Sequence, residues 1–391
     1  MGNFIQLHLL TNYGPSNLNR DDLGRPKTVV IGGVQRLRIS SQSLKRACRT
    51  SDLFEELSCG IRTKEMGVKI KDAFTTDCSL EEILLDKIKT PSKTSGIAEK
   101  EAKAWAWKIA SVFVDKMKKG KPDTTEDDEN SDKENKKDKK KEKSNVDKDT
   151  LKGEQIVFYY PEEIAKMSAL ITKLKGGEQA PSDKEINDLL VDRGSGIDVS
   201  MFGRMMACSP AYNVEAAVQV AHAFTVHKAA VEDDYFTAVD DLNVKEEHSG
   251  SAHIGAAEFG AGVFYLYICI DRNLLRENLS GDKELTNKAI GAFIGSVVTV
   301  SPSGKQNSFA SRSYASYILA EKGEVQPRSL SVAFLKPISS DDIFVSAIEA
   351  IENTKSAFDK VYNENDIQSK VVNILKPEAG TLKELIEFCK E

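Results

Sequence analysis

The stretch GGVQRLRISSQSLKRACR, residues 32–49, places two kinds of hydrophobic spacing side by side. Leu37 and Ile39 alternate with arginines, which is the period of two that indicates a strand. Ser40 and the serine after it then offer an N-cap, and a helix is predicted from about Gln42. A strand that runs directly into a helix predicts a fold that mixes α and β structure.

The predicted helix divides its residues between two faces. One face is small and apolar, and it carries Leu44, Ala47, Cys48 and Ser51. The opposite face is polar and cationic, and it carries Gln42, Lys45, Arg46 and Arg49. Cations in such a stripe can neutralise successive phosphates without reading bases. An ordinary amphipathic surface helix shows the same division. The basic strand with Arg36 and Arg38, and the Gly32-Gly33 pair that lets bare backbone approach a phosphate, favour a nucleic-acid site.

Charge is distributed unevenly along the chain. The 391 residues have a net charge of −6, with 54 Lys and Arg against 60 Asp and Glu. Residues 20–49 hold eight basic and two acidic residues, so this segment carries +6 and the remainder −12. This balance excludes a protein that binds nucleic acid through overall positive charge. A nucleic-acid site must therefore be a local concentration of Lys and Arg.

Length and composition exclude several other classes of protein. A chain of 391 residues allows two or three domains. No apolar run approaches the roughly 18 residues of a membrane span. The N-terminal MGNFIQLHLL lacks the basic start and the cleavage site of a signal peptide. The six cysteines lie far apart in sequence, so we expect reduced thiols. These features predict a cytoplasmic protein without a membrane partner.

One segment has no globular character. Residues 118–150 contain eleven Lys and eleven Asp or Glu, and Val146 is their one apolar residue. Such a stretch cannot bury enough surface to offset the entropy of ordering its backbone. We expect a disordered surface insertion. The run KKDKKKEK, residues 136–143, could instead tether nucleic acid, although the interleaved acids cancel most of its field.

The remaining pattern indicates further strands and helices. Besides the strand before Ser40, predicted strands cover residues 4–11 (half-buried), 218–227, 263–270 and 330–335. Predicted helices cover residues 99–117, 161–175, 184–192, 211–220, 284–299, 341–362 and 381–390. Without the long helical middle, the order is strand, helix, two strands, helix, strand. This is the split β-α-β order of ferredoxin-like and RNA-recognition folds.

A series of motifs resembles one family, the CasC family, which forms the repeating backbone of type I-E CRISPR surveillance complexes (Cascade). The N-terminal motifs are His8, PSNLNRDD (15–22), Lys27 and residues 32–49. The later motifs are SMFGRM (200–205), VAHAFTVH (220–227), YFTAVDDL (235–242), GSAHIGAAEFGAGVFYLY (250–267) and GKQ (304–306). The resemblance covers most of residues 3–50 and 197–270.

The resemblance implies an α+β fold shaped like a right hand. An RNA-recognition-motif or ferredoxin-like palm would carry an inserted helical fingers domain and a β-hairpin thumb. The palm would comprise residues 1–58, 206–230 and 262–391, the last with C-terminal helices. The fingers would be residues 59–205, including the charged loop 118–150, and the thumb residues 231–261.

The resemblance also implies roles for individual residues. Arg20, Lys27 and the polar stripe of Gln42, Lys45, Arg46 and Arg49 would hold the backbone of a guide RNA, with Arg38 beside them. Met205 would be an apolar wedge against a base, Gly203 would let the chain turn close to the RNA, and Arg204 would be an ion-pair partner or an RNA contact. Tyr235 and Phe236 would stack on splayed bases at the hairpin. Many members carry Trp where this chain has Tyr235, and Phe236 has the alternative of being an ordinary hairpin core residue.

The implied function is that of a non-catalytic scaffold in antiviral defence. Copies of the chain would stack head to tail along a guide crRNA, which pairs with target DNA. Its partners would be that RNA, the target DNA through the guide, other copies of itself, CasA-, CasB-, CasD- and CasE-like Cascade subunits, and a recruited or fused nuclease. No cofactor or metal is implied.

An enzyme is the alternative to a scaffold. Asp21 and Asp22 are adjacent acids within the basic segment, and related type III backbone subunits use an early aspartate for metal-dependent RNA cleavage. Two adjacent aspartates are a weak signal for such a site. The five histidines form no H-E-x-x-H motif, so a zinc site is not predicted. We expect a binding protein.

Overall fold

The computed structural model describes residues 3–85, 97–114, 150–177, 180–238, 253–362 and 366–391. The chain divides into two compact units, which are described separately. The sheet unit comprises residues 1–57, 217–276 and 282–391, and the helical unit comprises residues 58–216 and 277–281. Residues 206–216, expected in the palm, fall in the helical unit. The expected disordered loop 118–150 lies outside the described residues, apart from Thr150.

The sheet unit is built on one antiparallel sheet. Its strands follow the order β11-β10-β1-β9-β7-β3-β2, and β6 pairs with β9 beside β7. The strands are β1 (Phe4–Ser16), β2 (Thr28–Ile31), β3 (Val34–Ile39), β6 (Val218–Val220), β7 (Ala223–Thr225), β9 (His253–Asp271), β10 (Ala315–Gly323) and β11 (Gln368–Asn373).

The centre of this sheet has ferredoxin-like topology. If β1, β7, β9 and β10 are counted along the chain, the spatial order is fourth, first, third, second, and each neighbouring pair is antiparallel. Helix α1 (Ser41–Arg49) comes between the first and second of these strands, and α11 (Lys283–Thr299) between the third and fourth. The predicted α+β fold class is confirmed.

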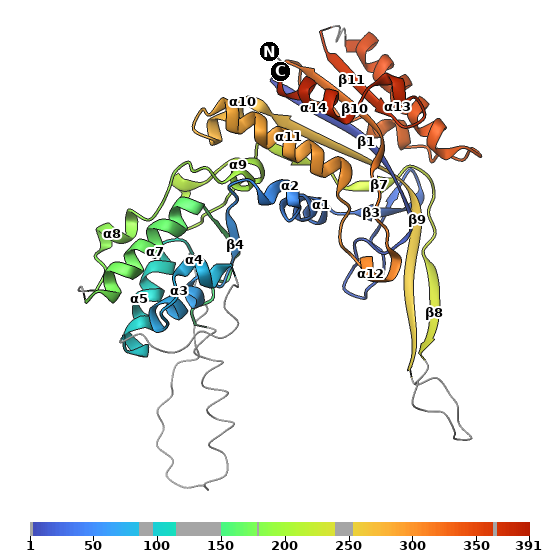
Figure 1. The fold of residues 1–391 in the computed structure, drawn as a ribbon. Helices are drawn as coiled ribbons and strands as arrows, with labels where there is room; N and C mark the ends of the chain where they lie inside the picture. Colours follow the sequence, from blue (N-terminus) through green and yellow to red (C-terminus); the bar gives the residue numbers. More distant parts are fainter. Residues whose placement is uncertain (1–2, 86–96, 115–149, 178–179, 239–252, 363–365) are drawn as a thin grey trace, which may run out of the picture. The chain divides into compact units, whose positions relative to one another are not determined.

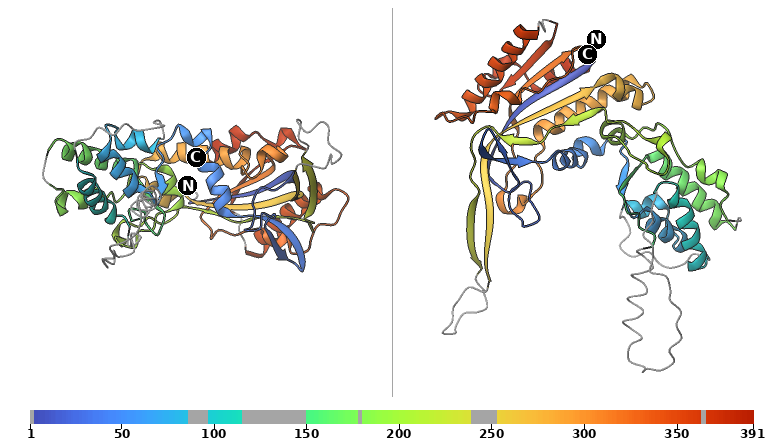
Figure 2. Two further views of the ribbon diagram at one scale, coloured as in Figure 1. Left: turned by 90° about the horizontal axis from the view of Figure 1, so that it is seen from below. Right: turned by 180° about the vertical axis from the view of Figure 1, so that it is seen from behind.

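Both faces of the sheet are covered. One face packs Leu10, Tyr265 and Tyr317 against α13 (Ile343–Tyr362) and the 3-10 turn η2 (Ser331–Phe334). On the other face α11 lies along the sheet, with α1 and α14 (Leu382–Lys390) beside it (Figures 1 and 2). The predicted half-buried strand at residues 4–11 is therefore wrong in its exposure, because polar His8 is as fully buried as its apolar neighbours.

Strand β9 continues beyond the sheet. Its outer half, from His253 to Phe259, pairs with β8 (Glu232–Ala238), and its inner half pairs with β1 from Gly260 to Asp271. The two strands form a long hairpin that projects from the sheet in Figure 1. The residues between the strands, 239–252, lie outside the described ranges.

The helical unit has its own apolar core. Its elements are β4 (Ile61–Thr63), α3 (Met66–Thr75), α4 (Leu80–Leu84), α5 (Glu99–Ser111), β5 (Val157–Tyr159), α7 (Pro161–Lys175), α8 (Asp183–Asn187), α9 (Ile197–Phe202) and the turn η1 (Pro210–Tyr212). Phe74, Trp105, Phe113 and Met167 are buried together in this core. None of the helices described in either unit is long and apolar enough to cross a membrane.

The remaining short helices belong to the sheet unit or lie at its boundary. They are α2 (Asp52–Glu55), α10 (Arg272–Asn278), α12 (Gln306–Phe309) and η3 (Pro377–Ala379).

Two predicted elements are wrong. Residues 211–220 do not form a helix, because Val214 pairs with Arg204 in a bridge and Val218–Val220 pair with β9. Residues 330–335 form the turn η2 rather than the last strand of the central sheet, and that position belongs to β10. Buried Glu321 and Lys322 interrupt the apolar pattern of β10, which is why its sequence does not stand out as a strand.

Candidate nucleic-acid interface

Helix α1 holds its polar stripe away from the protein core. The Ser40 hydroxyl caps the helix by accepting the Ser43 N–H at 3.4 Å, and the Asn19 side chain accepts the Ser40 N–H at 2.8 Å. Leu44 and Cys48 are buried on the inner face. On the predicted RNA-binding stripe, Gln42 and Arg46 are exposed, and Lys45 and Arg49 are half-buried. Partial burial lowers the pKa of the Lys45 ammonium, since burial disfavours its charged form.

The loop at residues 17–27, before β2, is held in shape by its own polar groups. The Asp21 carboxylate accepts the N–H groups of Leu23 and Arg25 at 3.0 and 2.9 Å. The Arg25 guanidinium pairs with Glu258 on β9 at 2.9 Å. The backbone of Arg20 forms an antiparallel β-bridge with Pro26, and Arg20 is exposed. The loop thus presents Arg20 to solvent from a fixed position.

The aspartates proposed for cleavage have a structural setting. Asp21 uses its carboxylate to close the loop, whereas Asp22 is exposed. Among the residues that the structure describes, no three His, Cys, Asp or Glu side chains are grouped so that they could hold a metal ion. The observed geometry therefore gives Asp21 a role in shaping the loop.

A cavity of about 690 Å³ lies between the 17–27 loop, α1 and the segment after α11. Arg20 and Arg46 line it together, so the structure joins two predicted RNA contacts that are 26 residues apart. Ser43 and Ser301 also line it, and sequence reasoning did not assign them. Gly304 approaches the loop so closely that an added Cβ would lie 2.2 Å from the Leu18 carbonyl oxygen. The GKQ motif, which starts at Gly304, is the sequence feature that could have indicated this part of the cavity.

Arg38 and Lys27 lie at the junction of β2, β3 and β7. The Arg38 guanidinium donates to His222 Nδ1 at 2.7 Å. The backbone of Lys27 accepts the Arg38 N–H at 2.8 Å and donates to the Asn19 carbonyl at 2.9 Å. This links both residues to the cap of α1. The contact of His222 with Arg38 is a site feature that the sequence did not indicate.

Two features attributed to RNA binding are internal instead. Arg36 is fully buried, where it donates to the carbonyls of Thr225 and Phe334 at 2.8 and 3.0 Å. Gly32 packs against the backbone of Leu335, which directly follows η2. An added Cβ at Gly32 would lie 1.7 Å from the Leu335 carbonyl oxygen. The expectation of a basic Arg36 and Arg38 strand face is therefore corrected to Arg38 alone.

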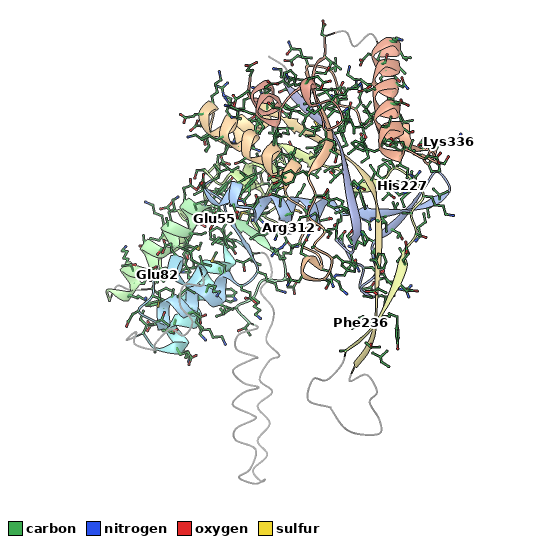
Figure 3. All side chains as sticks on the ribbon, turned by 45° about the vertical axis from the view of Figure 1, so that its right-hand side comes forward. Glu55, Glu82, His227, Phe236, Arg312 and Lys336 are labelled. Atoms are coloured by element: carbon green, nitrogen blue, oxygen red, sulfur yellow. The ribbon has the colours of Figure 1, made fainter. Side chains whose placement is uncertain are left out.

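Tyr235 and Phe236 lie on opposite faces of β8, where they oppose Ala256 and Gly255. Tyr235 is 66% exposed and Phe236 43%. The Phe236 ring covers Gly255, because a Cβ there would be 2.4 Å from the ring. Phe236 lies on the projecting hairpin (Figure 3). Tyr235 is thus the more available of the two for stacking on a base.

Met205 and Arg204 belong to the helical unit. Met205 is 74% exposed, as an apolar wedge requires. Arg204 is buried and pairs with Glu163, with both oxygens 2.8 Å from its Nη1. Of the two roles left open for Arg204, the structure shows the ion pair. Gly203 has a positive φ of 81°, and a Cβ would meet the Val214 carbonyl at 2.9 Å, so it serves the turn into the Arg204–Val214 bridge.

Comparison with known proteins adds to this geometry. The family described as CT1975-like protein, whose designation carries the prefix Cas, matches residues 5–387. The chain belongs to this family. The CasC-type resemblance seen in the sequence is thereby confirmed at the level of the family. No curated protein matches the sequence.

Solved structures similar to this CT1975-like chain support the fold. One, described as "CRISPR RNA-guided surveillance complex, pre-nicking", is 28% identical with a TM-score of 0.70, covering 94% of this chain and 90% of its own. Another, described as "CRISPR RNA-guided surveillance complex", is 22% identical with a TM-score of 0.64, covering 99% of both chains. The second supports the fold alone.

Proposed function

We propose that this chain is a non-catalytic backbone subunit of a CRISPR RNA-guided surveillance complex. It holds the phosphate backbone of a guide crRNA and leaves the bases free to pair with target DNA, in cytoplasmic antiviral defence. The observation that carries the proposal is the outward polar stripe of α1, whose Arg46 lines one cavity together with Arg20 of the neighbouring loop. The family match and the 28% identical structure support it.

The chemistry of the stripe suits a backbone contact. Lys and Arg side chains neutralise phosphates in a way that does not depend on sequence. Gln42 adds a neutral donor at the exposed start of the same stripe. A protein that grips only the backbone leaves sequence specificity to base pairing, as other RNA-guided systems do.

Assembly along the RNA is the second part of the proposal. Copies bind head to tail, and a contact of this kind need not close into a ring, so an open filament can form. Tyr235 on the β8–β9 hairpin stacks on a base, and exposed Met205 wedges against another. The CasA-, CasB-, CasD- and CasE-like subunits and a recruited or fused nuclease complete the complex.

A salt series tests the backbone contact. We expect Lys45→Ala with Arg49→Ala to weaken binding of single-stranded RNA and to flatten its dependence on salt. The loss of two phosphate contacts lowers the slope of log affinity against log salt by about 1.4. Lys360→Ala with Lys383→Ala makes the same change in charge at exposed sites on α13 and α14, and should leave the slope unchanged.

The salt series is read by mobility shift, and the integrity of the RNA is read on a denaturing gel. Together these readouts distinguish a scaffold from a nuclease. A slope equal to that of the wild type in the Lys45 and Arg49 variant would contradict the phosphate assignment. RNA cut at even intervals only with Mg²⁺, and left intact by Asp22→Ala or Asp21→Asn, would show a nuclease. Asn at position 21 keeps an oxygen for the two loop N–H groups, so loss of cutting would not simply report a collapsed loop.

A further inference from the structure

A second pocket of the sheet unit is formed by residues of β2, β3 and β7, together with His222 just before β7. It has a volume of about 430 Å³ and is lined by Thr28, Val29, Ile31, Arg38, His222 and Phe224. Arg38 and Phe224 are direct cross-strand partners in the β3–β7 pair, so a charged and an aromatic side chain meet on one face. The lining thus combines aliphatic and aromatic side chains with Thr28 and with Arg38 and His222, which contact each other.

The charged and titratable side chains that line this pocket, Arg38 and His222, are both basic. Arg38 donates to His222 Nδ1 at 2.7 Å, which requires that this nitrogen carry no proton. Partial burial lowers the pKa of His222, and the positive charges of Arg38 and Lys27 lower it further. Within the described part of the chain, neither Arg38 nor Lys27 forms an ion pair with an acid. Two cations and an imidazole thus face each other without a counter-ion.

The pocket is close to the RNA-binding helix in the chain. Arg38 precedes the N-cap Ser40 by two residues, and Asn19 joins the two sites. Its backbone carbonyl accepts from Lys27, and its side chain accepts from Ser40. Lys27 and Arg38 are therefore connected to the cap of α1 through Asn19.

We propose that this pocket is a nucleotide subsite of the guide-RNA path, in which one phosphate binds among Lys27, Arg38 and a protonated His222. This inference rests on the proposed function. The phosphate takes over the Arg38 N–H, and the freed Nδ1 accepts a proton from solvent and donates it in a hydrogen bond to the phosphate. The sugar or base of that nucleotide lies against Val29 and Phe224. His222 and Phe224 are new members of the binding surface.

The subsite couples RNA binding to proton uptake. The charges that act on His222 are those of Arg38 on β3 and of Lys27, which directly precedes β2, and the remaining lining residues carry no titratable group. Histidine is the side chain whose charge ordinarily changes near neutral pH, so His222 is the group in this pocket that changes. RNA affinity should rise as the pH falls from about 8 to 6, because the bound phosphate favours the imidazolium form.

Calorimetry on the full chain tests this inference. A single-stranded RNA is titrated in two buffers of different ionisation enthalpy, which gives the number of protons taken up on binding. Wild type should take up protons, and His222→Asn should lose that uptake and most of the rise in affinity at low pH. Asn keeps an oxygen near the position of Nδ1 for Arg38 and cannot be protonated. His227→Asn, outside the pocket, serves as the histidine control and should keep the uptake of the wild type.

The outcomes separate the subsite from the proposed function. RNA binding with equal proton uptake in wild type and His222→Asn would overturn the subsite and leave the scaffold function standing. If wild type binds no RNA at any pH, both fail. A third arm uses inorganic phosphate alone. If phosphate reproduces the His222-dependent uptake in full and RNA causes none, the pocket is a site for free anions and the subsite is wrong.

Discussion

The side chains of Arg204 and Glu163 are both fully buried. Their ion pair and further hydrogen bonds must therefore offset the free energy of hydration that the two charges lose on folding. Arg204 also donates to the Val191 carbonyl at 2.9 Å and lies over the Tyr160 ring at 4.6 Å. Glu163 accepts the Tyr160 and Val191 N–H groups at 2.9 and 3.1 Å. The pair therefore fastens the start of α7 to the segment that carries exposed Met205.

Removal of one partner leaves the other charge buried without compensation. We expect Glu163→Ala to lower the free energy of unfolding of the helical unit by about 3–5 kcal/mol. Urea unfolding followed by circular dichroism measures this loss. Glu101→Ala on the exposed side of α5 is the matched control and should change stability by less than about 0.5 kcal/mol. Equal midpoints for the two variants would show that the pair is dispensable.

At the level of single residues, the sequence could not tell which arginines of β3 are buried. Arg36 and Arg38 share a face of β3 by alternation, yet Arg36 is buried against two carbonyls while Arg38 is half-buried beside His222. Burial of Arg36 depends on Phe334, which is about three hundred residues away, and no local pattern contains that contact. The stripe of α1 was predictable because a helix with buried Leu44 and Cys48 determines where its other side chains point.

At the level of elements, the β2–β3 turn illustrates how a short motif combines two requirements. Gly32 and Gly33 have positive φ values of 61° and 78°, as a two-residue type I′ turn requires. Gly32 also packs on the Leu335 carbonyl, whereas nothing lies within 4 Å of a Cβ at Gly33. The first glycine is needed for conformation and space, and the second for conformation alone.

The two glycines therefore form a matched pair for mutation. Gly33→Ala should destabilise the sheet unit by about 1–2 kcal/mol, the cost of a left-handed backbone for an L-residue. Gly32→Ala should cost more, since the methyl group would overlap Leu335 and displace η2. Thermal unfolding compares them directly. If Gly33→Ala were the more damaging variant, the contact with Leu335 would not matter.

Helices with clear caps were predicted well, and strands less so. The predicted helix at residues 161–175 coincides with α7, and Ser40 caps α1 as expected. Strands depend on partners that are distant in sequence. β10 carries buried charges that only its neighbours satisfy, as where Glu321 accepts from His8 at 3.1 Å and from Arg328 at 2.9 Å. Tertiary pairing overrode local preference at these positions.

At the scale of the whole molecule, the proposed assembly along RNA assigns the hairpin a role that can be tested. We expect Tyr235→Ala to reduce the number of copies bound along a long RNA while leaving the fold intact, because one base stack contributes about 1–3 kcal/mol. Native mass spectrometry counts the copies. Tyr314→Ala removes a tyrosine of similar exposure, 68%, just before β10, and should assemble as wild type does. Full occupancy by the Tyr235 variant would remove the stacking role.

The continuity of β9 has a mechanical consequence. One strand of 19 residues is paired with β8 at its outer end and with β1, an interior strand of the sheet, at its inner end. A pull along the hairpin is transmitted by covalent bonds to the β1–β9 ladder, where it loads the hydrogen bonds in shear, so that many must yield together. The hairpin is thus continuous with the sheet through β9, whose register against β1 shifts between Tyr13 and Ser16. Force applied to the outer half of β9 is therefore carried by the hydrogen bonds between β9 and β1.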